Sequence, residues 1–256
     1  FDYTQENYTY HLWVMEGFTS YYASAALQRA GITSKDDFIT SLFNIINGVE
    51  SRPGNQLQPV AMASFDAWIK QYRPNENSYN TTISYYPKGQ VLAALLDLMI
   101  LHETEGQKSL DDIMQYLWEF YKEEDRGFTD EELLEAFETV SGMELDDWFE
   151  KHVYGTERPD YETIFGYAGI EVNDELKDNT IPYWGGGLSS EGGVLKVTSV
   201  HRGASAYEGG INVKDEILAV DGFRVRSEKG IDTYLEMAGS AIRWTSLSVG
   251  RTFFKP

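Results

Sequence analysis

Hydrophobic positions recur at helical spacing through the first part of the chain. Aromatic and aliphatic residues repeat in this way over residues 11–30, and Gly31 provides a stop. The same spacing, together with capping residues and breakers, predicts further helices over 34–49, 65–72 and 87–105, and two more that begin at Ser109 and Thr129. We therefore expect residues 1–158 to form an all-α domain.

After Pro159 the pattern changes to short β-type runs separated by Gly and Asn/Asp turns. The expected strands are 164–172, 194–200, 216–220 and 247–252, with one helix at about 231–238. Asp221 and Gly222 predict a tight turn between two strands. The expected fold class is α+β with more than one domain: a helical domain over 1–158 and a small β-rich domain over 164–256.

Composition and charge narrow the classes of function. The chain has 256 residues, of which 42% are hydrophobic and 14% aromatic, and this composition argues for a packed fold. It contains no cysteine, which excludes disulfides, thiolate catalysis and Cys-type zinc sites. A net charge of −20 disfavours binding to nucleic acid or to anionic lipid. No apolar run approaches the roughly 20 residues of a membrane span. The compartment stays open between cytoplasm, periplasm and export.

The histidines do not supply a complete zinc motif. A zinc-binding His-Glu-x-x-His helix needs imidazoles at positions i and i+4. His102 and Glu103 begin such a motif, but Gly106 stands where the second histidine is required. His102 is then a cation at a helix C-terminus, where the helix dipole favours it.

Two local patterns carry candidate chemistry. The first is Leu-Trp-Val-Met-Glu-Gly-Phe-Thr-Ser-Tyr-Tyr over 12–22, with Glu16 in mid-helix. The second is Ile-Ser-Tyr-Tyr-Pro-Lys-Gly over 83–89, with Tyr85 and Tyr86 at a helix N-terminus. A phenol at that place can donate a hydrogen bond to a developing oxyanion. From residue types alone, a surface glutamate and a packed aromatic pair are the simpler interpretations.

Together the two patterns resemble the zinc aminopeptidases of the gluzincin group, most closely the glycyl aminopeptidase-like family. Members of that family join a thermolysin-like catalytic region to a C-terminal PDZ domain. Their second helix reads Trp-x-x-Glu-Gly-Phe/Leu-x-x-Tyr-Tyr, and residues 13–22 fit it. The resemblance implies that Glu16 is the third zinc ligand and that Tyr86, or alternatively Tyr85, stabilises the transition state. The segments 51–55 and 64–69 also resemble the family.

The β-rich part resembles a bacterial-type PDZ core. Residues 197–200, 203–211 and 215–222 read as a strand, a turn into a short Ala-rich helix, and a strand followed by a tight turn. The module ends at Pro256, and we expect it to be one strand short of a complete PDZ domain. The resemblance implies a peptide-binding loop, whose backbone N–H groups receive a C-terminal carboxylate, formed by Gly166, Tyr167, Ala168, Gly169 and Ile170. A bound peptide is expected in a groove between the strand after Tyr167 and the helix at about 231–238. The other possibility is that an intramolecular segment fills this groove.

The expected function is that of the C-terminal part of a zinc aminopeptidase. In the intact enzyme, metal-activated water would attack a peptide bond, with small N-terminal residues such as Gly or Ala preferred by the family. The His-Glu-x-x-His helix should lie upstream of Phe1, so this chain alone is expected to bind no zinc tightly and to be inactive. The rival hypothesis is a non-catalytic PDZ module that binds peptides and uses the helices as scaffold.

Overall fold

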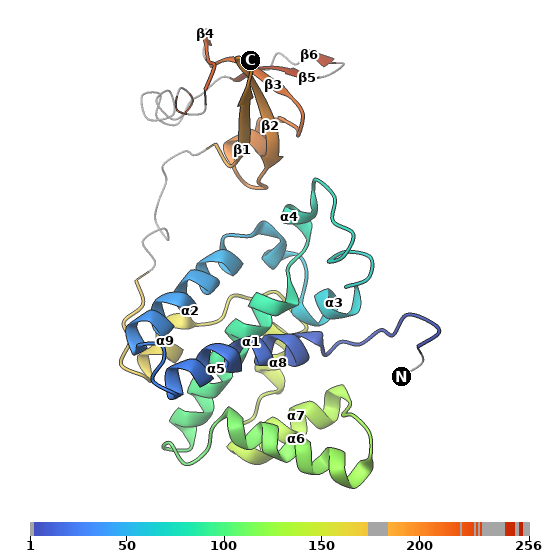
Figure 1. The fold of residues 1–256 in the computed structure, drawn as a ribbon, viewed down its shortest axis with the longest axis vertical. Coiled ribbons are helices and arrows are strands. Elements are labelled where there is room, and N and C mark those ends of the chain that lie inside the picture. Colours follow the sequence, from blue (N-terminus) through green and yellow to red (C-terminus); the bar gives the residue numbers. More distant parts are fainter. Residues whose placement is uncertain are drawn as a thin grey trace. The chain divides into compact units, whose positions relative to one another are not determined.

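A computed structural model of the chain describes residues 3–173, 184–220, 222–227, 229, 231, 244–248 and 251–252. These residues divide into two compact units (Figure 1). The first unit comprises Phe1–Arg73 and Thr81–Asn173, and the second comprises Pro74–Asn80 and Asp174–Pro256. Helices make up the first unit and an antiparallel sheet dominates the second, so the α+β fold class is confirmed.

The first unit is built from helices joined by short turns. They are α1 (Leu12–Arg29), α2 (Lys35–Glu50), the 3-10 helix η1 (Pro53–Gln56), α3 (Val60–Phe65), α5 (Tyr85–Glu103), α6 (Leu110–Glu124), α7 (Asp130–Ser141), α8 (Asp146–His152) and α9 (Tyr161–Gly166). The short α4 (Ser78–Thr81) lies where the chain returns from the second unit. Within the described part of the chain, no helix is both long enough and apolar enough to cross a bilayer.

Helix α5 is the centre of the helical unit. It packs most extensively against α1 and also contacts α2, α3, α6 and α9 (Figure 1). Its middle, from Val91 to Leu96, is almost fully buried. A helix that is apolar on all sides is stable only inside a core, so the other helices must surround it.

The predicted helix starts are confirmed at three places. Ser34 accepts a hydrogen bond from the backbone N–H of Asp37 and caps α2. Ser109 and Thr129 both form full capping boxes, at the starts of α6 and α7. Such local side-chain bonds are encoded within four residues, which explains why the sequence reveals them.

The expected helix at 65–72 is wrong in position. Helix α3 begins directly after Pro59 and ends at Phe65, and residues 66–72 form turns. Proline favours the start of a helix because it has no N–H to donate. The apolar run after Pro59 therefore forms the helix, and the helix ends before Asp66.

The expected strand at 164–172 is also wrong. Residues Tyr161–Gly166 form α9, which the side chain of Asp160 caps by accepting the N–H of Thr163 at 3.0 Å. Phe165 is buried in the helical core, where its ring lies 4.9 Å from that of Phe43. The first unit thus runs to Asn173, later than the expected division at 158–164.

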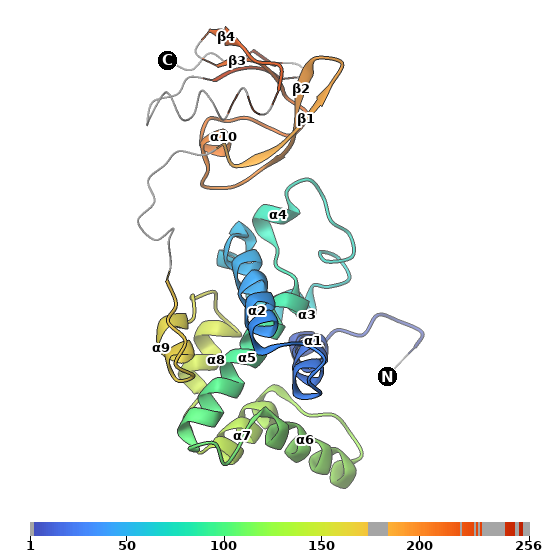
Figure 2. The same cartoon turned by 60° about the vertical axis from the view of Figure 1, so that its left-hand side comes forward.

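The second unit contains the predicted strands 194–200 and 216–220. Its sheet is formed by β1 (Gly186–Glu191), β2 (Val194–Val200), β3 (Glu216–Val220), β4 (Phe223–Arg224), β5 (Trp244–Ser248) and β6 (Arg251–Thr252). The described strands pair antiparallel in the order β1-β2-β3-β5-β6, with β4 paired to β3. Val220 lies opposite Phe223, as the tight turn predicts. The short helix α10 (Ser205–Glu208) belongs to this unit (Figure 2), and its residue Ala206 is buried.

Asn80 joins the segment Pro74–Asn80 to the sheet of the second unit. Its side-chain amide donates to the carbonyl oxygen of Val200 at 2.7 Å and accepts the backbone N–H of Arg202 at 2.8 Å. The side chain is buried, as these two backbone bonds require. The ring of Tyr79 lies 4.4 Å from that of His201. This segment thus belongs to the second unit although first-unit residues flank it.

Candidate functional site

Glu16 lies in the middle of α1, at the border between core and surface. Trp13 and Gly17 on the same helix are buried, whereas Glu16 is half-buried. The hydroxyl of Ser64 accepts the backbone N–H of Trp13 at 3.0 Å and fixes the start of α1. Among the described residues, no donor is hydrogen-bonded to the Glu16 carboxylate.

Two glycines bring α1 and α5 into backbone contact beside Glu16. A Cβ built on Gly17 would lie 2.5 Å from the Cα of Gly89, and one built on Gly89 would lie 2.2 Å from the carbonyl oxygen of Trp13. No side chain fits between backbones that lie this close. The crossing places the first turn of α5, which carries Tyr86, beside the turn of α1 that carries Glu16.

The two candidate tyrosines differ sharply in environment. Tyr85 is only 1% exposed, and its hydroxyl lies 2.7 Å from that of Tyr72. Tyr86 is half-buried, and its ring stacks on that of Tyr85 with 4.8 Å between centroids. Partial burial raises the pKa of Tyr86, and the Tyr72 hydroxyl and the negative charge of Glu16 raise it further. Tyr86 is therefore the phenol whose pKa the charge of Glu16 affects, and it stays protonated at neutral pH.

The loop after α2 holds the chain that leads into α5. Arg52 donates through Nε to the carbonyl oxygen of Thr82 at 2.6 Å, and the side chain of Gln58 accepts the backbone N–H of Ile83 at 3.0 Å. A Cβ on Gly54 would meet the Thr82 carbonyl oxygen at 2.1 Å, so glycine is required there. The segment 51–55 resembles the family in sequence. Its structural role is to fix the backbone just before Tyr85.

A buried ionic cluster on α5 was missed by the sequence reasoning. Lys88 is 4% exposed, and its Nζ lies 3.9 Å from Oε1 of Glu50. The same carboxylate oxygen accepts hydrogen bonds from the Tyr161 hydroxyl at 2.7 Å and from the Asn55 side-chain amide at 3.3 Å. Burial lowers the pKa of Lys88, while the charge of Glu50 opposes that change. A lysine in the first turns of a largely apolar helix was the signal in the sequence.

The histidines of the described part do not assemble a metal site. His11 pairs with Asp130, His152 is buried with Nδ1 3.0 Å from the carbonyl oxygen of Glu157, and His102 stacks on Tyr167. Within the same residues, no three His, Asp or Glu side chains gather closely enough to hold an ion. Glu16 is thus a single carboxylate of the kind zinc accepts, and further ligands would have to come from elsewhere.

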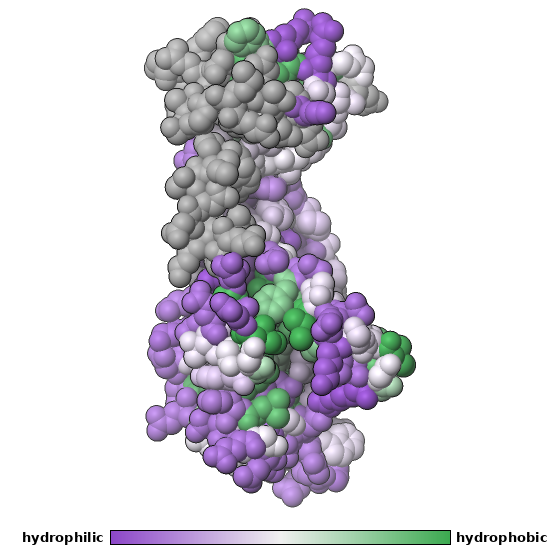
Figure 3. Space-filling view, turned by 90° about the vertical axis from the view of Figure 1, so that its left-hand side faces the viewer, coloured by the Kyte–Doolittle hydropathy of each residue, from purple (hydrophilic) through white to green (hydrophobic). Residues whose placement is uncertain are grey.

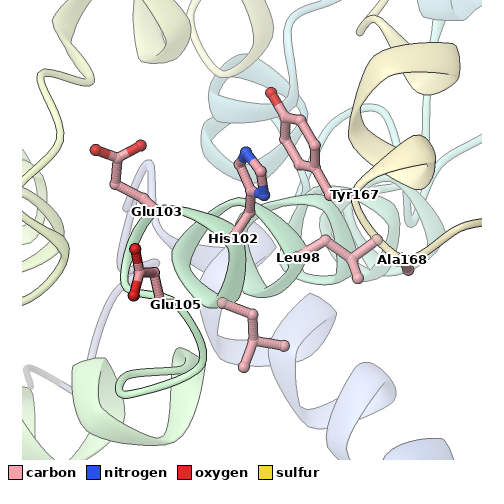
Figure 4. Close-up of a pocket in the computed structure, with 7 residues that line it drawn as sticks. Leu98, His102, Glu103, Glu105, Tyr167 and Ala168 are labelled. Atoms are coloured by element: carbon pink, nitrogen blue, oxygen red, sulfur yellow. The ribbon is translucent and has the colours of Figure 1, made fainter.

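The five residues expected to form a peptide-binding loop begin at Gly166, the last residue of α9, and lie in the first unit. The ring of Tyr167 lies parallel to that of His102, with 3.8 Å between centroids and 4° between planes. Together with Ala168 they line an open depression at the end of α5, and Glu103 and Glu105 lie on the other side of His102 (Figure 4). Figure 3 shows apolar side chains gathered in the middle of one face of this unit, with hydrophilic side chains around them.

The described residues directly after this loop, 171–173, form no strand. Most of the expected helix at 231–238 lies outside the described residues. The peptide-binding role of Gly166, Tyr167, Ala168, Gly169 and Ile170 therefore stays a prediction.

Comparison with known proteins identifies the region that holds the two candidate residues. Residues 1–92 match the sequence model of the M61 glycyl aminopeptidase family, and both Glu16 and Tyr86 lie in that match. Among solved structures, the chain is similar to the crystal structure of an aminopeptidase N family protein from Idiomarina loihiensis, with 26% identity and a TM-score of 0.81.

The structural match covers 94% of this chain but 43% of the other, so the chain spans less than half the length of that relative. No curated protein matches the chain. The motif over 12–22, the family match over 1–92 and the structural likeness agree, and together they support a glycyl aminopeptidase-like family for this chain.

Proposed function

We propose that this chain is part of a zinc-dependent aminopeptidase that releases small N-terminal residues such as Gly or Ala. The observation that carries the proposal is the placement of Glu16 beside Tyr86 by the contact of Gly17 with Gly89. In peptide hydrolysis at a zinc site, a carboxylate can bind the metal and a phenol can donate a hydrogen bond to the oxyanion. The preference for small residues rests on family resemblance alone.

Glu16 would serve as one zinc ligand. Its carboxylate has no competing donor among the described residues, and a carboxylate oxygen is an ordinary zinc ligand. Zinc, when bound, supplies a Lewis acid that polarises the scissile carbonyl and lowers the pKa of water. The two histidine ligands and the general base would come from sequence outside this chain. For that reason we expect no tightly held zinc in this chain alone.

Tyr86 would donate its phenol proton to the oxyanion that forms at the scissile carbonyl. A donor that is already aimed at this charge lowers the barrier, because it need not reorganise during the reaction. Tyr85 is the weaker candidate, since its hydroxyl is buried and engaged with Tyr72. The raised pKa of Tyr86 keeps its proton in place up to alkaline pH.

The proposal is tested in a longer protein that contains this chain. Glu16→Gln should lower the zinc retained after dialysis, because a charged ligand is lost. Tyr86→Phe should retain zinc and lower kcat by about 10²–10³-fold, the usual loss for one oxyanion donor. Glu131→Gln and Tyr121→Phe make the same chemical changes at exposed positions and should have no effect.

Two results would count against this assignment. Full zinc content and full activity in Glu16→Gln would remove Glu16 from the metal site. A larger loss of kcat in Tyr85→Phe than in Tyr86→Phe would move the oxyanion role to Tyr85. For the isolated chain, one zinc ion retained per molecule after dialysis would contradict the expected division of the ligands.

We further propose that the second unit is a PDZ-like module. The order of β2, the four-residue helix α10 and β3 supports this, since it follows the pattern expected from the sequence. Titration of C-terminal peptides while backbone amide shifts are followed tests it. Shifts along β2 or α10 would support peptide binding by the second unit, and their absence at millimolar peptide would contradict it. Shifts along 166–170, which lie in the first unit, would separately support the peptide-binding role predicted for that loop.

A further inference from the structure

Helix α6 carries a row of large side chains that is open to solvent. It lies beside α7 at one end of the helical unit (Figure 1 and Figure 2). One face of α6 is buried in the core through Leu110, Ile113 and Leu117. A neighbouring face carries Met114, Trp118 and Tyr121, which are 38%, 56% and 46% exposed. Their spacing of four and three residues places them on one side of the helix, and we call these three residues the α6 stripe.

The two aromatic rings of the α6 stripe pack on each other and still reach solvent. Trp118 and Tyr121 stack with 5.6 Å between ring centroids and 27° between ring planes. The face of an aromatic ring attracts a cation that lies within about 6 Å of its centroid. The turn after α6 already makes such a contact, because the guanidinium of Arg126 lies 5.0 Å from the ring centroid of Phe120. The exposed rings of the α6 stripe are therefore suited to a further cation.

The surface around the α6 stripe is strongly acidic. Residues 110–141, which form α6, the turn and α7, contain eleven Asp or Glu residues and two Lys or Arg residues. Both basic residues already pair with glutamates of the same segment, Lys122 with Glu119 at 2.6 Å and Arg126 with Glu132 at 2.6 Å. Asp125, at the C-terminal end of α6, is exposed, and no cation in the described part of the chain pairs with it. Such an excess of negative charge favours a positively charged partner.

We propose that the α6 stripe is a docking surface for a basic peptide segment of another protein, with an arginine side chain over Trp118 and an apolar side chain against Met114. Arginine fits better than lysine, because its planar guanidinium stacks on an aromatic face and is more weakly hydrated. The inference does not rest on the proposed peptidase activity. The α6 stripe lies on a different helix from Glu16 and from Tyr86, so a docked partner adds an interaction to the chain and no step to the reaction.

The first test titrates the peptide acetyl-Arg-Leu-Ala-Arg-Leu-Ala-Arg-amide into the 256-residue chain. The acetylated N-terminus prevents cleavage by an aminopeptidase, so the result does not depend on activity. With tryptophan labelled with 15N, the indole N–H signal of Trp118 should shift during the titration. The same peptide with citrulline in place of each arginine has nearly the same shape and no charge, and it should bind about tenfold more weakly. A rise in salt from about 20 to about 200 mM should also weaken binding, because exposed charges are screened.

The second test compares variants by the fluorescence anisotropy of the labelled arginine peptide. Trp118→Leu keeps an apolar side chain and removes the ring, so it should weaken binding by about two- to fivefold, as expected for one exposed cation–π contact. Trp68→Leu makes the same change at another exposed tryptophan, outside residues 110–141, and should leave the affinity unchanged. Asp125→Asn should weaken binding at low salt and have little effect at high salt.

Equal affinity for the arginine and citrulline peptides, or equal affinity of Trp118→Leu and the unmodified chain, would overturn the proposal. Two other occupants of the α6 stripe would overturn it as well. Sedimentation that shows a dimer which Trp118→Leu dissociates would mean that a second copy of this chain covers the α6 stripe. In a longer protein that contains this chain, a Trp118 signal that no longer responds to the peptide would mean that another part of that protein covers it.

Discussion

Gly17 and Gly89 face each other where α1 crosses α5, and neither position has room for a Cβ atom. The atoms that a Cβ would meet at either glycine are backbone atoms, which cannot move aside as the tip of a side chain would. The separation of the two helices, and with it the distance between Glu16 and Tyr86, is therefore set by the absence of two side chains.

We predict that Gly17→Ala lowers the free energy of unfolding by about 1–3 kcal/mol, the usual cost of overpacking a core. Gly48→Ala is the matched control, since a Cβ there meets nothing within 4 Å and α2 is already helical. This control should be stabilising by about 0.5–1 kcal/mol because alanine favours the helix. Urea unfolding measures the free energy of unfolding of both variants. Equal effects of the two substitutions would contradict the close contact of α1 with α5 at Gly17.

Tyr21 and Asp97 form a second buried link between α1 and α5. The Tyr21 hydroxyl donates to Oδ2 of Asp97 at 2.5 Å, and the backbone N–H of Leu110 donates to Oδ1 at 2.8 Å. Tyr21→Phe leaves a buried carboxylate with one donor fewer, and we expect a loss of about 1.5–3 kcal/mol in unfolding free energy. Tyr116→Phe on the outside of α6 is the control. Equal stability of the two variants would contradict the prediction.

The capping box at the start of α7 predicts a dependence of stability on pH. Hydrogen bonds from Arg126, followed by that from the backbone N–H of Thr129, lower the pKa of Glu132 to about 2. The folded pKa lies below the usual value of about 4.3, so the stabilisation is complete above that pH and is lost as the pH falls towards 2.

Glu132→Gln should therefore lower the Tm at pH 7 and have a much smaller effect near pH 2. Glu131→Gln, its neighbour in the same first turn, serves as the control for the general loss of negative charge at a helix N-terminus. Thermal unfolding at both pH values checks this. A difference between Glu132→Gln and the control that does not shrink at pH 2 would show that Glu132 acts by some means other than its charge.

Asn80 provides a test confined to the second unit. Asn80→Ala removes two hydrogen bonds to the backbone at Val200 and Arg202 and should cost about 1–3 kcal/mol. The amide of Arg202 should then exchange faster with deuterium, whereas the amides of α5 keep their protection. Asn44→Ala on the exposed side of α2 is the control. Unchanged exchange at Arg202 would contradict the bonding of Asn80.

Local signals explain how much of this fold the sequence predicts. The capping residues Ser109 and Thr129 and the turn before Phe223 act within a few residues, and the structure confirms them. The run at 164–172 is apolar and short, so its spacing does not separate strand from helix. Packing of Phe165 against Phe43, a residue far away in the sequence, decides for the helix. The sequence sign of a helix at this place was Asp160, a residue type that favours the N-cap position.

The candidate site shows the same division. Its motif residues, Glu16 and Tyr86, are recognisable from their neighbours in the sequence. The partner of Tyr85 is not, because the contact with Tyr72 depends on how a turn after α3 folds back on α5. The same holds for Glu50, which gathers Lys88, Asn55 and Tyr161 from three separate segments. Such clusters follow from tertiary packing and leave no local pattern.

Because Pro74–Asn80 belongs to the second unit, that unit is not a contiguous stretch of the gene product. A fragment cut to begin after Asn173 would lose Asn80, and the carbonyl of Val200 and the N–H of Arg202 would lose their partners. Recombination that moved only the C-terminal segment to another protein would leave behind residues 74–80, which belong to the same unit. The inheritance of this module is thereby tied to the helical sequence that surrounds residues 74–80.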